Sequence, residues 1–266
     1  MTTTNNNMTN AIVSAATADK LRAYALRYET ASFLQGDPSW FMHQVHGRAN
    51  QEAMAFLASC LSYGSRRQFM PKIQQLLDWS CGEVDAWVRS GEFARYLHEG
   101  SKQCYYRLYT EGHMHDLLRA YKTLLCRYGT LGDYVATNAT DGYTAVAAIC
   151  KFFASEGANV VVPKDTQSAC TRVCMFMRWM VRSGSPVDLG LWADNIDRRT
   201  LIMPLDTHVV SQACRLNLLH SRTASMSVAR RLTQALAQVF PDDPLRGDFA
   251  LFGYGVNEGN DLPATE

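Results

Sequence analysis

Apolar residues recur at every third and fourth position along most of the chain, which is the spacing of amphipathic helices. The pattern begins at Asp19 and predicts further helices over residues 50–61, 68–77, 82–96, 114–128, 140–156 and 229–239. The alternation typical of strands is nearly absent, and residues 159–163 (NVVVP) form the one segment that we expect to be extended. The pattern therefore predicts an all-α protein of roughly ten helices.

Length and composition narrow the class of protein. The chain has 266 residues, of which 47% are hydrophobic, so it can bury a sizeable core. Lys and Arg number 26 and Asp and Glu 25, and a net charge of +1 excludes a protein that coats a polyanion indiscriminately. No segment has the 18 or more apolar residues of a membrane span, and residues 1–18 look like a polar, disordered leader. We expect a cytoplasmic protein.

Eight cysteines are spread along the chain without the C-x-x-C spacing of a zinc or thioredoxin site. We interpret them as reduced thiols of the core, and we expect no metal and no cofactor. An acidic group at Asp242, Asp243 and Asp248 is interpreted as ordinary helix capping and is assigned no chemistry.

Two segments carry candidate chemistry. Asp206, in the sequence PLDTH, lies at a loop-to-helix junction, where an aspartate either caps the helix or takes part in a site. Residues 165–182 begin with polar cap-type residues and continue as an apolar helix with three arginines. Such a helix start can bind a phosphate, or its arginines can pair with carboxylates at the rim of the core.

A third segment, residues 103–127, interleaves tyrosines with arginine ahead of a helix. This mixture can stack on nucleic acid, or its rings can be core aromatics beside a turn.

Taken in order, four segments resemble the helix-hairpin-helix DNA glycosylase superfamily, of which endonuclease III is a member. They are AFLASCLSYGSR (55–66), CYYRLYTEGHMHDLLRAYKTLLCRYG (104–129), SACTRVCMFMRWM (168–180) and PLDTHVVSQACRL (204–216). More closely, residues 168–182, 187–192, 204–209 and 248–253 are similar to the signatures of an uncharacterised bacterial family related to that superfamily. The resemblance covers residues 20 to 257.

The resemblance implies a two-lobed, all-α helix-hairpin-helix fold. Residues 19–257 would form one unit, with a middle lobe of about residues 50–156 and another lobe built from residues 19–49 and 157–257. The active cleft would lie between the two lobes.

The resemblance also implies roles for individual residues. Asp206 would be the catalytic carboxylate that stabilises the deoxyribose cation and activates water. Double-stranded DNA would be held through phosphate contacts from Gln167, Ser168, Ala169, Cys170, Arg172 and Arg178. The pocket for the flipped base would be lined by Tyr63, Gly64, Thr171 and His208.

The chain departs from the superfamily at several positions. Thr171 occupies the place of the lysine nucleophile of bifunctional members, and threonine cannot form a Schiff base, so no lyase activity is expected there. The four closely spaced cysteines of the endonuclease III iron–sulfur cluster are missing, so no cluster is expected.

Three hypotheses follow. The first is a monofunctional DNA base-excision glycosylase in which Asp206 acts with a water nucleophile. The second is a DNA-structure-binding protein without hydrolysis. The third is a helical binding domain with no nucleic-acid role, in which Asp206 is only a cap. The first two predict that positive potential is concentrated around Asp206 and residues 168–182.

Overall fold

The computed structural model describes residues 12–257 and is mostly helical, which confirms the all-α class. The α-helices are α1 (Ala15–Tyr28), α2 (Arg48–Leu61), α3 (Arg66–Trp79), α4 (Val84–Ser90), α5 (Glu111–Tyr128), α6 (Leu131–Asn138), α7 (Gly142–Ser155), α8 (Thr171–Val181), α9 (Thr207–Arg215), α10 (Met226–Ala237), α11 (Arg246–Asp248) and α12 (Tyr254–Asn257). Shorter elements are the 3₁₀ turns η1 (Ala31–Leu34), η2 (Pro38–His43), η3 (Glu92–Arg95) and η4 (Arg198–Thr200), and the π-helix η5 (Phe249–Gly253).

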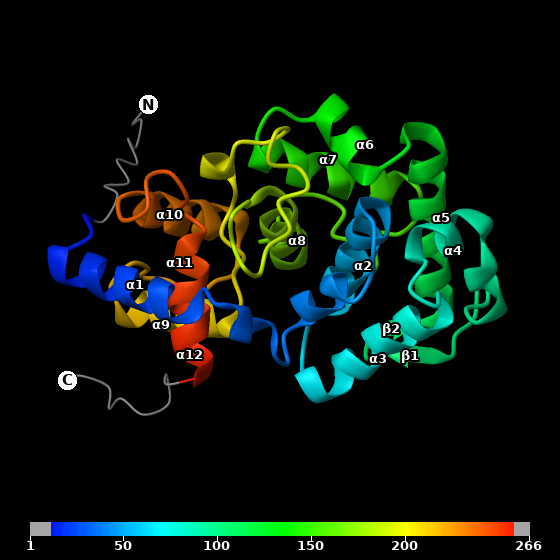
Figure 1. Ribbon diagram of the computed structural model, residues 1–266, viewed down its shortest axis with the longest axis horizontal. Helices are drawn as coiled ribbons and strands as arrows, with labels where there is room; N and C mark the ends of the chain where they lie inside the picture. Colours follow the sequence, from blue (N-terminus) through cyan, green and yellow to red (C-terminus); the bar gives the residue numbers. More distant parts are fainter. Residues whose placement is uncertain (1–11, 258–266) are drawn as a thin grey trace, which may run out of the picture.

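The first helix lies with the last ones. Helix α1 packs on η5 and α11, and α9 packs on η5 and α12, so both ends of the described chain gather on one side, at the left of Figure 1. Helices α2 to α7 occupy the other side. Helix α8 contacts both α2 and α7 and lies between the two groups. The residues on the two sides of α8 therefore come from distant parts of the sequence.

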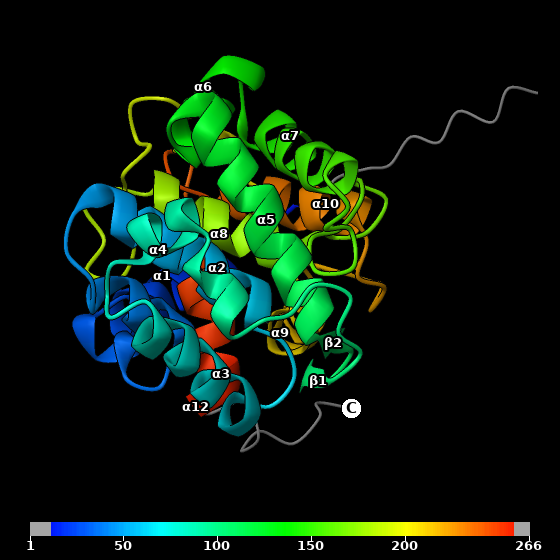
Figure 2. The same cartoon turned by 90° about the vertical axis from the view of Figure 1, so that its right-hand side faces the viewer.

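A small hairpin adjoins the longest helix. Strands β1 (Cys104–Tyr106) and β2 (Tyr109–Thr110) pair antiparallel, with Cys104 opposite Thr110 and Tyr106 opposite Tyr109. Figure 2 shows α5 running lengthwise from this hairpin towards α6. At the start of α5, the Thr110 hydroxyl accepts a hydrogen bond from the His113 backbone N–H, and the His113 ring accepts one from the Thr110 backbone N–H.

The prediction that residues 159–163 are extended was wrong. These residues form turns, in which the backbone N–H groups of Val161 and Val162 both donate to the Ala158 carbonyl. Val161 and Val162 are buried, so the apolar run anchors a loop to the core instead of pairing in a sheet. A short valine run cannot distinguish these two uses.

The beginning of the chain also differs from expectation. Residues 1–11 of the predicted leader lie outside the described residues, but α1 already begins at Ala15, within the predicted range of 1–18. The Ser14 hydroxyl accepts a hydrogen bond from the Thr17 backbone N–H and so caps the helix before its apolar periodicity starts.

All eight cysteines are free thiols, but only half of them are core residues. Cys81, Cys104 and Cys126 are exposed and Cys214 is partly exposed, which corrects the expectation of core thiols. Within residues 12–257, no helix is long and apolar enough to cross a membrane.

A buried ionic cluster joins the two ends of the chain to α8. Its members are Glu29, Arg178, Arg182, Asp188, Asp243 and Asp248. Arg182 pairs with Glu29 after α1, with Asp188 after α8 and with Asp243 after α10. Asp243 and Asp248 are therefore ion-pair partners in the interior, which corrects their interpretation as caps without further role, whereas Asp242 is exposed.

Candidate functional site

A cleft of about 810 Å³ lies at the junction of α3, α8, α9 and η5. Its lining includes Tyr63, Gly64, Thr171, Arg172, Arg178, Asp206 and His208, seven residues that the sequence analysis singled out. Residues that the sequence analysis did not assign to a site also line it, among them Phe33, Asp37, Arg66, Arg222, Asp248 and Phe252. The volume falls in the range of about 300–1,000 Å³ that is usual for small-molecule sites.

Asp206 combines a structural role with a place in the cleft. Its Oδ1 accepts a hydrogen bond from the Val209 backbone N–H at 2.7 Å and so caps α9. Burial raises the pKa of Asp206, and the hydrogen bond from Val209 and the charges of His208 and Arg66 oppose this rise. The carboxylate is thus made more basic than an exposed aspartate. Capping and a role in the cleft are compatible.

Thr171 positions the start of α8 against the segment that carries Asp206. Its hydroxyl donates to the Leu205 carbonyl at 2.8 Å. The neighbouring backbone of Asp206 is therefore tied to the first residue of α8. At this position threonine supplies a hydrogen bond and contains no amine that could act as a nucleophile.

Arg172 lies within a cluster of tyrosines at one wall of the cleft. Its Nη1 donates to the Cys60 carbonyl at 2.6 Å and to the Tyr109 hydroxyl. The guanidinium carbon lies 5.2 Å from the Tyr63 ring centre and 5.7 Å from that of Tyr109. Burial raises the pKa of Tyr109 to about 12 against the effect of Arg172. Arg172 therefore holds the rings of Tyr63 and Tyr109 in place at this wall. Its Nη1 is already hydrogen-bonded to Cys60 and Tyr109.

The hairpin β1–β2 reaches the same wall. The Tyr106 hydroxyl donates to the Tyr63 carbonyl, and the guanidinium of Arg107 lies 5.5 Å from the Tyr63 ring centre. Gly64 has φ +81°, and a Cβ there would meet the Arg107 side chain and lie 3.0 Å from the Tyr106 hydroxyl. A glycine at position 64 is thus needed both for the backbone conformation and for the approach of the hairpin.

Arg178 does not lie at an exposed rim, contrary to its predicted phosphate contact. The residue is 3% exposed, and it donates through Nε to Asp188 at 3.1 Å and through Nη1 to Asp248. Arg182, which follows α8, is buried as well, so Arg172 is the one arginine of the three in residues 168–182 that can contribute positive charge to the cleft. The sequence of an apolar helix with arginines is compatible with a phosphate contact and with pairing to carboxylates. In the structure Arg178 pairs with the buried Asp188 and Asp248.

The predicted phosphate-binding loop is not part of the cleft lining. Gln167 and Ser168 are exposed, whereas Ala169 and Cys170 are buried. The Gln167 backbone N–H donates to the Asp165 carboxylate at 2.9 Å and that of Cys170 to the Ser168 hydroxyl at 3.4 Å. These two N–H groups are occupied within the loop. Cys170 has φ +47°, which turns the chain into α8.

The opposite wall of the cleft comes from segments that sequence reasoning missed. Arg66 pairs with Asp37 at 3.4 Å, and its guanidinium carbon lies 5.4 Å from the Phe252 ring centre. His208, which is exposed, meets the Phe252 ring edge-to-face with centres 6.0 Å apart. The only sequence signal for this wall was the similarity of residues 248–253 to a family signature.

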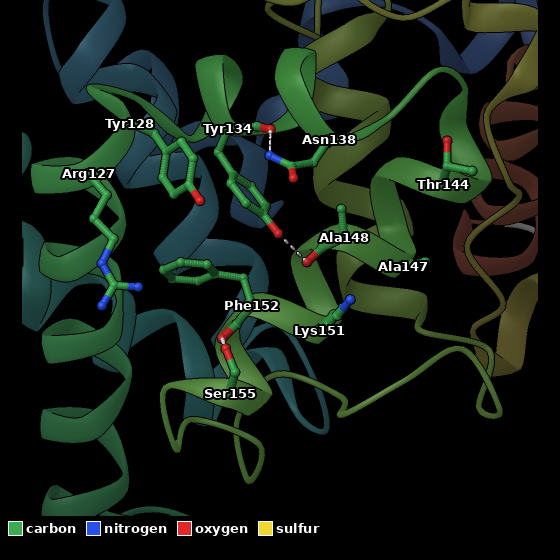
Figure 3. Close-up of a pocket in the computed structure, with 10 residues that line it drawn as sticks. All are labelled: Arg127, Tyr128, Tyr134, Asn138, Thr144, Ala147, Ala148, Lys151, Phe152 and Ser155. Atoms are coloured by element: carbon green, nitrogen blue, oxygen red, sulfur yellow. Dashed lines mark hydrogen bonds between the residues drawn. The ribbon is translucent and has the colours of Figure 1, made fainter.

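A second cavity of about 510 Å³ lies between α5, α6 and α7, and Figure 3 shows its lining. The rings of Tyr128, Tyr134 and Phe152 lie beside one another, and the Tyr134 hydroxyl donates to the Ala148 carbonyl. Its lining contains no carboxylate. We therefore place the candidate chemistry in the cleft with Asp206. Within residues 12–257, no group of three or more His, Cys, Asp and Glu side chains could hold a metal ion.

Comparison with known proteins adds one family. Residues 37–257 match the model of a family described as a protein of unknown function, DUF2400. No curated protein and no solved structure matches the chain. The matched region contains the whole cleft apart from Phe33.

Proposed function

The chain belongs to the DUF2400 family, and from the geometry of its cleft we propose that it is a monofunctional DNA glycosylase related to the helix-hairpin-helix superfamily. The observation that carries the proposal is Asp206, a partly buried carboxylate with a raised pKa at the start of α9, in a cleft of about 810 Å³. A cleft of this volume can accept a base that has been flipped out of a duplex.

The proposed reaction is hydrolysis of the bond between C1′ of the deoxyribose and the nitrogen of the base. The bonding electrons leave with the base, and the Asp206 carboxylate stabilises the positive charge that develops on the sugar. Water attacks C1′ and gives up a proton to Asp206, whose raised pKa favours its role as a base. That proton then passes through solvent to the departed base, which restores the Asp206 carboxylate, and the products are a neutral free base and an abasic site. Thr171 offers no amine, so the strand is not cut through a Schiff base.

The tip of the hairpin β1–β2 supports engagement of DNA. Leu108 is 79% exposed, and Arg107 beside it contacts the Tyr63 ring at the cleft wall. Proteins that distort DNA insert apolar side chains between base steps and use adjacent arginines to hold the backbone. Leu108 would fill the space left by the flipped base, and Arg222, an exposed residue of the cleft lining, would attract a phosphate.

A panel of duplexes tests the proposal. Each duplex carries one oxidised, deaminated or alkylated base, and alkali after incubation converts any abasic site into a strand break. We expect breaks on at least one duplex only after alkali. Asp206→Asn keeps an oxygen that can cap α9, and it should lower base release by about 10²-fold or more with DNA binding retained.

Asp141→Asn is the matched control. Asp141 caps α7 by accepting from the Thr144 backbone N–H at 2.7 Å, the same distance as the Asp206 cap, but it does not line the cleft. Its base release should equal that of the wild type. Salt-dependent DNA binding without base release would contradict the glycosylase and identify a DNA-binding protein. The absence of DNA binding at low salt would exclude both nucleic-acid functions.

A further inference from the structure

The segment that follows Asp206 is positively charged. Residues 207–241 contain four arginines and two histidines but no aspartate or glutamate. The whole chain has 26 Lys and Arg against 25 Asp and Glu, so the chain outside this segment has an excess of acidic residues. The arginines of the segment, all of them exposed, are Arg215, Arg222, Arg230 and Arg231. The net charge of +1 therefore results from a positive segment in an otherwise negative chain.

Two loops connect this segment to the cleft. Arg222 lies in the loop between α9 and α10 and lines the cleft. Three residues further on, Ser225 pairs with Ser168 in an isolated antiparallel bridge. The bridge holds the loop before α10 against the loop before α8. The surface next to Arg222 is therefore continuous with residues 164–168.

Arg230 extends this surface along α10. Its guanidinium carbon lies 5.1 Å from the ring centre of Tyr143, at the start of α7. The hydroxyls of Tyr143 and Thr166 are hydrogen-bonded at 3.1 Å, and Thr166 lies two residues before Ser168. These contacts link Arg230 to the bridge beside Arg222. We call the surface made by Arg222, Ser225, Ser168, Thr166 and Arg230 the arginine surface.

The two guanidinium groups of the arginine surface are not neutralised by the protein. Neither Arg222 nor Arg230 forms an ion pair with any of residues 12–257. Asp165, the one acidic residue of the adjoining loop 163–170, accepts a hydrogen bond from the Gln167 backbone N–H. An exposed, unpaired guanidinium can bind a phosphate through two hydrogen bonds. The Tyr143 ring orients Arg230, which reduces the freedom that its side chain loses on binding.

We propose that the arginine surface binds the phosphate backbone of double-stranded DNA beside the cleft. The choice of duplex DNA as the partner rests on the proposed function, whereas the charge distribution does not. Figure 2 shows α7, α10 and α9 on the same side of the molecule as the hairpin β1–β2. A duplex lying along this side reaches both Leu108 and the arginine surface. The phosphate contacts expected from Arg178 and from the loop 167–170 are thus assigned to Arg222 and Arg230.

The salt dependence of DNA binding tests the proposal. Fluorescence anisotropy with a short undamaged duplex gives the binding constant at several salt concentrations. Each phosphate contact that is lost lowers the slope of log K against log salt by about 0.9. We expect Arg222→Gln and Arg230→Gln each to lower the slope by about 0.9, and the double variant by about 1.8. Because both side chains are exposed, the melting temperature should not change, and this measurement shows that the variants fold.

Arg95→Gln is the matched control. Arg95 is an exposed arginine of η3 that forms no ion pair with residues 12–257, so its replacement removes the same charge from another part of the surface. Its slope should equal that of the wild type. An unchanged slope in the double variant, or an equal decrease in Arg95→Gln, would overturn the proposal.

The duplex panel separates this proposal from the proposed function. Base release by the wild type together with an unchanged slope in the double variant overturns the arginine surface alone. A lowered slope without base release from any duplex contradicts the glycosylase and leaves the arginine surface as the DNA contact. If the wild type does not bind the duplex at low salt, both proposals are wrong.

Discussion

Replacing Arg182 with methionine should destabilise the protein severely, because the side chain is 2% exposed and serves three carboxylates. It donates to Glu29 at 2.6 Å, to Asp243 at 2.8 to 3.1 Å and to Asp188. Methionine fills much of the volume of arginine without its charge. The substitution thus leaves several carboxylates in the interior without one of their partners.

The magnitude follows from the cost of an uncompensated buried charge. Removing one partner of a buried ion pair costs about 3–5 kcal/mol, whereas replacing a whole buried pair with apolar residues is often neutral. For a protein of this size, each kcal/mol lowers the melting temperature by about 2–4 °C. We therefore expect Arg182→Met to melt about 6–20 °C below the wild type.

Urea unfolding and thermal melting at pH 7 measure the effect. Arg199→Met is the control, because Arg199 pairs with Asp197 at 2.6 Å while 62% of its side chain is exposed. Its stability should not change measurably. A loss in Arg182→Met of less than about 1 kcal/mol would refute the inference that the buried ionic cluster holds the chain ends to α8.

Three further predictions concern single side chains. Glu52 accepts hydrogen bonds from Leu131 and Gly132 and from the Trp192 ring, so Glu52→Gln should lose about 2 kcal/mol of unfolding free energy in urea, and a loss under about 0.5 kcal/mol would contradict this. Burial raises the pKa of Glu29, but its arginine partners outweigh burial and lower it overall, so its stabilisation is present above the ordinary value of 4.5 and lost as pH falls through the lower value in the folded protein. Glu29→Gln should therefore be less stable than the wild type at pH 7, and the two melting curves should converge in acid; a difference independent of pH would contradict the assignment. Leu108→Ala should weaken DNA binding about tenfold in fluorescence anisotropy without altering the melting temperature, and unchanged affinity would remove the hairpin tip from the DNA contact.

Local patterns in the sequence sufficed for most helices. The periodicity at residues 50–61 and 114–128 corresponds to α2 and α5, whose apolar faces are buried, although both helices start earlier than predicted. The start of α5 at Glu111 depends on the cap formed by Thr110 and His113, and an apolar pattern does not report a cap. The hairpin before α5 was missed because its two strands are only three and two residues long.

The part of the candidate site that depends on neighbouring residues in the sequence was predictable. Asp206 follows Pro204-Leu205 before an apolar helix, so its capping role can be derived from neighbouring residues alone. The environment of Asp206 could not be derived in this way. Asp248 and Phe252 line the same cleft as Asp206 because η5, which follows Asp248, packs on α9. Arg178 shows the same limit, since its burial depends on Asp188 and Asp248, which lie ten and seventy residues away. Such pairings arise from tertiary packing, which spacing along the chain does not encode.

The most direct test of the central claim does not require the lesion to be known. Duplex DNA treated with alkylating, oxidising and deaminating reagents is incubated with the wild type, Asp206→Asn and Asp141→Asn, and the free bases released are identified by mass spectrometry. The cleft with Asp206 predicts at least one base released by the wild type and by Asp141→Asn, and about 10²-fold less by Asp206→Asn. No released base, or equal release by all three proteins, would contradict the account of Asp206 as the catalytic carboxylate.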